Sequence, residues 1–127
     1  MKIEQAVALI KDKLPEKRVT HSLNVAETAV KLAEIYDGDA QKAELAGVLH
    51  DYCKYDDLGT MYQIVTSRGL DSNLLSYGVE VLHGPVAALI MQETFGIDDE
   101  EVLLAIKNHT TGRAQMTKTE KLVFIAD

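Results

Sequence analysis

A histidine and an aspartate stand side by side at the end of an apolar, small-residue helical segment. They are His50 and Asp51, which follow the run Leu45-Ala-Gly-Val-Leu49. The chain contains three other histidines, each on or near a predicted helix end: His21, His83 and His109. Imidazole nitrogens and carboxylate oxygens brought together from several helices are a donor set for transition metals. This pattern predicts a metal site within a helical bundle and indicates hydrolytic chemistry.

The donors can be divided between two adjoining metal sites. Four of them would join three helices around a first ion: His21, His50, Asp51 and Asp127, the last of which ends one more predicted helix. Asp51 can also bridge to a second ion, with His83 and His109 as its further ligands. Mixed imidazole and carboxylate ligands suit Fe, Mn, Zn or Co better than Mg. The alternative for each histidine is a surface or hydrogen-bonded core residue, which is the commoner role of a lone histidine.

Cationic and small residues accompany these donors. Arg18 precedes His21 by three residues, and Lys54 follows Asp51 by three. Because a planar guanidinium and a compact ammonium both neutralise phosphate charge, we interpret Arg18 and Lys54 as substrate contacts. Lys54 is also, with Asp51, a candidate catalytic residue. Three further candidates for phosphate binding follow the last histidine: Thr111, Gly112 and Arg113. The alternatives are solvated surface cations and an ordinary glycine turn.

Hydrophobic periodicity predicts an all-α chain, because apolar residues recur at helical spacing and no segment alternates as a strand would. The predicted helices cover residues 3–14, 16–36, 39–51, 58–65, 85–95, 98–109 and 117–127, with a short helix or loop at 71–78. Asp39 is a predicted N-cap, and Thr117 with Glu120 a predicted capping box. Pro85 suits the first turn of its helix, which would leave His83 just outside it. Asp98 with Glu101 predicts a further capping box.

The bulk composition limits the classes of partner. A chain of 127 residues indicates one domain, and a net charge of −7 argues against nucleic acid as a partner. It does not argue against a small phosphorylated substrate, because bound cations reverse the local charge. No run approaches the ~20 apolar residues of a membrane span, and the single cysteine excludes an internal disulfide. We therefore predict a cytoplasmic protein without a membrane partner.

Two further features concern packing. Cys53 lies in a tight helical segment, where a small buried thiol is commoner than a nucleophile. An apolar stretch around Met61-Tyr62 and Leu74-Leu75 can cover either the site or a partner subunit, which leaves a homodimer open.

The order of a histidine, a His-Asp pair and a distant aspartate resembles the HD superfamily of metal-dependent phosphohydrolases. The chain is most similar to its bacterial family of symmetrical diadenosine tetraphosphate hydrolases, and the resemblance covers nearly the whole chain. The phrases that carry it are Arg18-Val-Thr-His-Ser22, Leu45-Ala-Gly-Val-Leu-His-Asp-Tyr-Cys-Lys54, Leu82-His-Gly-Pro85, Ala105-Ile-Lys-Asn-His-Thr-Thr-Gly112 and Phe124-Ile-Ala-Asp127. The Leu-His-Gly-Pro and His-Thr-Thr-Gly phrases together are its most specific part.

The resemblance implies an HD-domain helical bundle with a di-metal centre, commonly iron, with Mn, Co and Zn as alternatives. It implies cleavage of a dinucleoside tetraphosphate into two nucleoside diphosphates. Family members usually extend beyond the position of Asp127, so we expect residues 1–127 to be a single HD domain truncated at its C-terminus. Three alternatives stay open. The first is hydrolysis of another nucleotide, namely an alarmone, a deoxynucleotide or a cyclic dinucleotide. The second is a non-catalytic nucleotide-binding regulator, and the third is a metal with a structural role only.

Overall fold

The computed structural model describes all residues from 1 to 127 and contains seven α-helices, one short 3-10 helix and no strand. The elements are α1 (Ile3–Lys13), α2 (Glu16–Ile35), α3 (Ala40–Leu49), α4 (Leu58–Ser67), η1 (Ser72–Ser76), α5 (Val79–Glu93), α6 (Glu100–Lys107) and α7 (Lys118–Ala126). The prediction of an all-α chain is confirmed. No helix is both long and apolar enough to cross a membrane.

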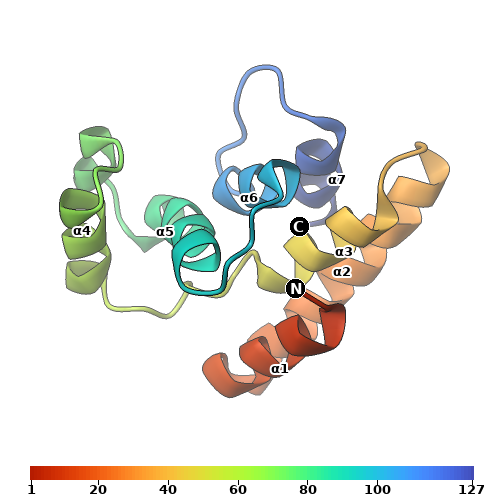
Figure 1. Cartoon of the computed structure of the whole chain (residues 1–127), viewed down its shortest axis with the longest axis horizontal. Coiled ribbons are helices and arrows are strands. Elements are labelled where there is room, and N and C mark those ends of the chain that lie inside the picture. The colour runs from red at the N-terminus through yellow and green to blue at the C-terminus, as the bar shows by residue number, and fades with distance from the viewer.

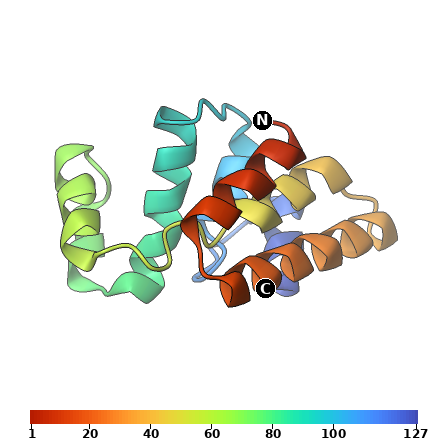
Figure 2. The same cartoon turned by 90° about the horizontal axis from the view of Figure 1, so that it is seen from below.

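The helices form a bundle from which one arm extends. On one side α2 packs against α3 and α7, and α6 lies between this group and α5 (Figure 1). Figure 2 shows α1 beside α3, which is its main contact. The arm consists of α4 and η1, which reach the other helices mainly through α5. The ends of α3, α6 and α7 are therefore brought to the same part of the bundle.

Small residues bring α2 and α3 unusually close together. A Cβ atom added at Gly47 would lie 2.7 Å from the Cα atom of Ala26, a separation that real Cβ atoms do not show. Ala43 and Ala46, on the same helix, are fully buried. This close contact places the end of α3, which carries the His-Asp pair, beside the helix that carries His21.

Local sequence signals set two of the helix starts as predicted. The Asp39 side chain accepts a hydrogen bond from the backbone amide of Lys42, and Thr117 and Glu120 form a reciprocal capping box. The start of α6 differs by one residue, because Asp99, not Asp98, is its N-cap. Either acid can reach amides two or three residues ahead, so the sequence pattern fits both.

The prediction that Pro85 opens a helix is wrong. Helix α5 begins at Val79, so Pro85 lies in its interior and His83 lies within the helix instead of outside it. An internal proline removes one helical hydrogen bond and costs about 3 kcal/mol. Burial of a large apolar side chain contributes about 1.5 to 3 kcal/mol, so a few such side chains offset the proline. Helix α5 buries Leu82, Val86, Ala87 and Met91.

The apolar stretch in the arm packs mostly within the chain. Met61 is fully buried in the main core, and the Tyr62 hydroxyl donates a hydrogen bond to the Tyr77 carbonyl at 2.8 Å. Leu74 packs against the core from its edge, whereas Leu75 is exposed. Cys53 is also fully buried, and burial raises the pKa of its thiol. A thiol that stays protonated is a poor nucleophile, which agrees with a packing role.

Candidate metal centre

The four histidines surround the carboxylate of Asp51, and the two carboxylate oxygens face different histidines. The Oδ1 atom lies 3.1 Å from the Nε2 atom of His83 and 3.6 Å from that of His109. The Oδ2 atom lies 3.3 Å from Nε2 of His50 and 3.6 Å from Nε2 of His21. Asp51 itself is almost fully buried. One buried carboxylate therefore contacts imidazoles from both sides.

Backbone carbonyls fix the orientation of the three buried imidazole rings. The Nδ1 atoms of His50, His83 and His109 lie 2.6, 2.8 and 2.7 Å from the carbonyl oxygens of residues 47, 79 and 106. Because a carbonyl only accepts, each Nδ1 carries the proton and donates it. The Nε2 atoms consequently point at Asp51 and at one another, where each can either carry a second proton or bind a metal ion. This is the arrangement in which histidines bind metals.

Two observations indicate that this donor set fits a bound cation. The Nε2 atoms of His83 and His109 are 2.9 Å apart, although both rings already hold their proton on Nδ1. Two lone pairs at that distance repel each other unless a positive charge lies near both. Nitrogen ligands about 2.1 Å from one ion lie about 3 Å apart when they bind at right angles. The Nε2 atom of His50 is buried and has no hydrogen-bond partner.

Asp127 completes a second group of donors next to the first. Its Oδ1 atom lies 3.0 Å from Nε2 of His21 and 3.3 Å from Nε2 of His50. His21, His50 and Asp127 can therefore reach one ion together, and so can His50, Asp51 and His109. His50 belongs to both groups, so the two groups adjoin.

The charges in the cluster are strongly coupled. Burial opposes ionisation of Asp51, but the hydrogen-bonding histidines outweigh it and hold the pKa of this carboxyl well below its ordinary value. The neighbouring His50 lowers the pKa of Asp127 to about 2. Burial disfavours the charged form of His50, yet the Asp127 and Asp51 carboxylates raise its pKa to about 9. Burial lowers the pKa of His109. Both carboxylates are therefore anionic at neutral pH.

All of the cluster except the fully buried His50 lines a polar pocket of about 310 Å³. The residues that line it are Arg18, His21, Asp51, Lys54, Glu80, His83, His109, Thr110, Phe124 and Asp127. The Arg18 guanidinium lies 3.1 Å from Oδ2 of Asp51, and the Lys54 ammonium lies 3.8 Å from the exposed Glu80 carboxylate. The structure thus brings both predicted cations to the pocket that contains the donors.

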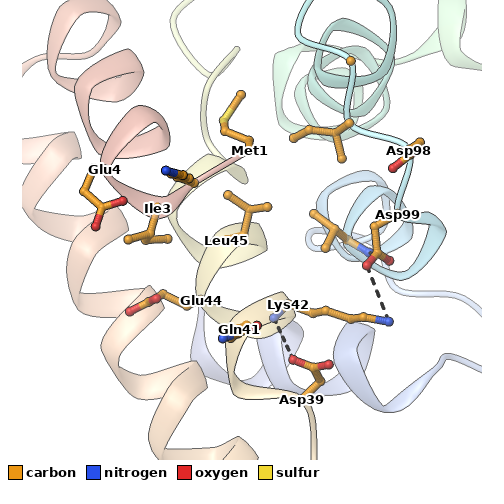
Figure 3. Close-up of a pocket in the computed structure, with 14 residues that line it drawn as sticks. Met1, Ile3, Glu4, Asp39, Gln41, Lys42, Glu44, Leu45, Asp98 and Asp99 are labelled. Atoms are coloured by element: carbon orange, nitrogen blue, oxygen red, sulfur yellow. Dashed lines mark hydrogen bonds and ion pairs between the residues drawn. The ribbon is translucent and has the colours of Figure 1, made fainter.

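A larger cavity of about 550 Å³ lies elsewhere, between the start of α1, the start of α3 and the connection from α5 to α6 (Figure 3). Figure 3 shows Asp39 turned back to the amide of Lys42, whose ammonium lies 3.5 Å from the Asp99 carboxylate. This cavity contains no histidine, and Asp39 and Asp99 serve as helix caps. The polar pocket is therefore the candidate functional site.

Comparison with known proteins agrees with this geometry. The family model described as HD domain matches residues 18–127. The chain belongs to the HD domain family. HD domains bind divalent metals, and the histidine and aspartate cluster could hold them in this chain.

Two relatives of this HD domain share one name. A protein from Staphylococcus aureus is 72% identical over 127 residues, which are 100% of this chain and 66% of that protein. One from Bacillus subtilis is 40% identical over 100% of this chain and 68% of its own length. Both are named symmetrical bis(5'-nucleosyl)-tetraphosphatase. The chain therefore spans about two thirds of the length of the relatives it matches.

A solved structure shares the fold of this HD domain. It is a predicted HD superfamily hydrolase involved in NAD metabolism from Clostridium acetobutylicum. The TM-score is 0.91 and the sequences are 38% identical, over 99% of this chain and 67% of the other.

The structure does not bring Thr111, Gly112 and Arg113 into the wall of the pocket. The Arg113 guanidinium donates instead to the buried Glu120 carboxylate at 2.9 and 2.7 Å. The Thr111 hydroxyl donates to the Gly112 carbonyl at 3.1 Å.

Sequence reasoning missed three residues that do line the pocket: Glu80, Thr110 and Phe124. Glu80 precedes His83 by three residues, and Phe124 precedes Asp127 by three. Helical residues at this spacing share a face, so the same signal that identified Arg18 beside His21 could have found both.

Gly84 determines how closely His83 approaches His109. A Cβ atom at Gly84 would lie 2.7 Å from the Lys107 carbonyl oxygen and 3.3 Å from Nδ1 of His109. Substitution Gly84→Ala must therefore push α5 away from the end of α6. We expect it to lower the free energy of unfolding by about 1 to 3 kcal/mol, the usual cost of overpacking.

Urea unfolding of the variant and of a matched control measures this effect. The control is Gly78→Ala, because a Cβ atom at the exposed Gly78 meets nothing within 4 Å. Equal stability of the two variants would contradict the close approach at Gly84.

Proposed function

We propose that this HD domain is a metal-dependent hydrolase that cleaves diadenosine tetraphosphate symmetrically into two molecules of ADP. The observation that carries the proposal is the convergence of four imidazoles on Asp51, in the wall of a pocket that also presents Arg18 and Lys54. The shared name of relatives that are 72%, 45% and 40% identical supports this substrate.

Two metal ions are assigned to the donors, with six ligand residues in all. His21, His50 and Asp127 would hold one ion, and His83 and His109 would hold the other. The two sides of Asp51 support its assignment as the bridge, because Oδ1 faces His83 and Oδ2 faces His50. We assign iron as the metal, with Mn, Co and Zn as alternatives, because imidazole and carboxylate ligands accept all four.

When bound, such a pair of ions activates a water molecule as nucleophile and neutralises phosphoryl charge. The residues of the chain supply the rest. Asp51 remains anionic and places a negative charge between the four imidazoles. The carbonyl-bound Nδ1 atoms keep the imidazole rings from rotating. Arg18 and Lys54 face the pocket as cations that bind the phosphate chain and offset the charge that develops on the leaving group.

Symmetrical cleavage breaks one bond between the two central phosphates. Water adds its oxygen to one of these phosphorus atoms, and the bridging oxygen leaves with the other half. One water and one diadenosine tetraphosphate then give two ADP. The good leaving group is a nucleoside diphosphate, whose charge the cations of the pocket stabilise.

The test is anaerobic hydrolysis of diadenosine tetraphosphate by the chain in the presence of Fe²⁺ or Mn²⁺, with products separated by chromatography. The expected result is two equivalents of ADP and loss of turnover after chelation of the metal. Formation of ATP and AMP would contradict symmetrical cleavage. Absence of turnover with metal shown to be bound would contradict hydrolysis of this substrate, and the same assay on other nucleotides would then separate another hydrolase from a binding role.

A further inference from the structure

Glu120 is a charged residue buried inside the bundle, on the helix that ends at Asp127. Its side chain is fully shielded from solvent, and its carboxylate accepts four hydrogen bonds. Arg113 donates two of them, from Nε at 2.9 Å and Nη2 at 2.7 Å. The Asn108 side-chain amide and the Thr117 backbone amide each donate one at 3.0 Å. Every part of this buried carboxylate therefore has a partner.

These contacts are of the strong kind. A bidentate arginine–carboxylate pair combines charge with fixed geometry, and the same carboxylate also receives two neutral donors. Burial opposes ionisation of Glu120, but Arg113, Thr117 and Asn108 outweigh it and lower its pKa to about 2. The carboxylate thus stays charged and bonded over the whole physiological pH range.

The partners of Glu120 connect two separate segments of the metal centre. Asn108 immediately precedes His109 at the end of α6. Glu120 itself lies two helical turns before Asp127 on α7. The contact between Asn108 and Glu120 therefore ties the backbone beside one donor to the helix that carries another. Arg113 holds the connection between the two helices against the same carboxylate.

We propose that Glu120 is a positioning residue that fixes His109 relative to Asp127, so that donors from two helices can bind their ions simultaneously. The inference rests on the proposed function, because it takes both residues as metal ligands. Glu120 lies outside the lining of the pocket and acts through Asn108 and through its own helix. Groups that orient the ligands of a metal typically change its affinity by 10- to 100-fold when they are removed.

The experiment measures binding of Mn²⁺ alone to the whole chain, with electron paramagnetic resonance reporting the free ion. Glu120→Gln removes the charge at nearly constant volume. Asn108→Ala removes only the hydrogen bond that connects Glu120 to the residue before His109. Arg113→Lys keeps the positive charge but loses the bidentate contact with the carboxylate. We expect the dissociation constant to rise about 10- to 100-fold for Glu120→Gln and about 10-fold for Asn108→Ala. Arg113→Lys should show a smaller rise, because a lysine restores part of the contact.

Thr119→Ala is the matched control. The Thr119 hydroxyl, also buried on α7, donates to Glu101 at 3.2 Å at the opposite end of α6. Its loss weakens the same helix pair without touching Asn108, so we expect a lower melting temperature with Mn²⁺ affinity unchanged. If Thr119→Ala weakens Mn²⁺ binding as much as Asn108→Ala does, Glu120 contributes only stability and the proposal is overturned.

Three other outcomes also test the positioning role of Glu120. Unchanged Mn²⁺ affinity in both Glu120→Gln and Asn108→Ala would overturn the positioning role while leaving the metal centre intact. Should Glu120→Gln fail to fold, Asn108→Ala decides alone, because Glu120 keeps its pair with Arg113 in that variant. A wild-type chain that binds no Mn²⁺ would overturn the metal centre itself, and the inference with it.

Discussion

Substitution Asp51→Asn is expected to abolish metal-dependent hydrolysis, with kcat lowered by about 10³-fold or more. Clamping of phosphoryl oxygens by metal ions stabilises the transition state by several kcal/mol, and each 1.36 kcal/mol changes the rate tenfold. Asparagine keeps the shape of the side chain, and its amide can donate to an imidazole Nε2 atom. The folded chain can therefore accommodate the change, while the charge between the two groups of donors is lost.

Metal content by mass spectrometry and turnover of diadenosine tetraphosphate are measured together. The matched control is Asp56→Asn, which removes a nearby carboxylate that pairs with Lys13 at 2.7 Å and does not line the pocket. The control should retain both metal and activity. An Asp51→Asn protein that keeps its metal but loses activity would contradict the bridging role, and one that keeps both would contradict the site altogether.

The melting temperature of the metal-free protein is expected to fall as the pH rises from 6.5 to 8.5. The Asp127 and Asp51 carboxylates raise the pKa of His50 to about 9 in the folded state, against 6.5 in the unfolded chain. The folded state therefore binds the extra proton, and its stabilisation is complete below pH 6.5 and lost as the pH rises through 9. The loss up to pH 8.5 amounts to roughly 2 to 3 kcal/mol, or several degrees.

Other groups in the cluster act outside this pH window. The lowered pKa values of Asp51 and Asp127 affect stability only in acid, where protonation removes their contribution. The lowered pKa of His109 reduces the stability of the folded state mainly below pH 6.5, where the imidazole of the unfolded chain is protonated. Thermal unfolding in the presence of a chelator therefore reports mainly on His50, because the raised pKa of the Cys53 thiol lowers stability only as the pH approaches 9. The fall of the melting temperature with pH should largely disappear in His50→Asn. An equal fall in that variant would assign the effect to another group.

The sequence by itself determined the helical class, most of the helix starts and which residues are candidate metal donors. These features depend on residues close together in the chain. Apolar spacing defines a helix within a few turns, and the caps at Asp39 and Thr117 act on amides three residues away. Arg18 was found for the same reason, because three residues along a helix return to nearly the same face. Lys54 lies in the turns that follow α3, where its backbone amide donates to the Asp51 carbonyl at 3.0 Å, so it too is a local neighbour.

Only the tertiary structure decided how these residues are used. Helix α5 passes through Pro85 because contacts with other helices outweigh the lost hydrogen bond. Arg113 pairs with Glu120 and not with the pocket because α7 packs against the end of α6. The two sides of Asp51 face different histidines because α2, α3, α5 and α6 meet there. Such contacts depend on how whole helices pack, and local propensity carries no information about which residue of another segment comes into contact.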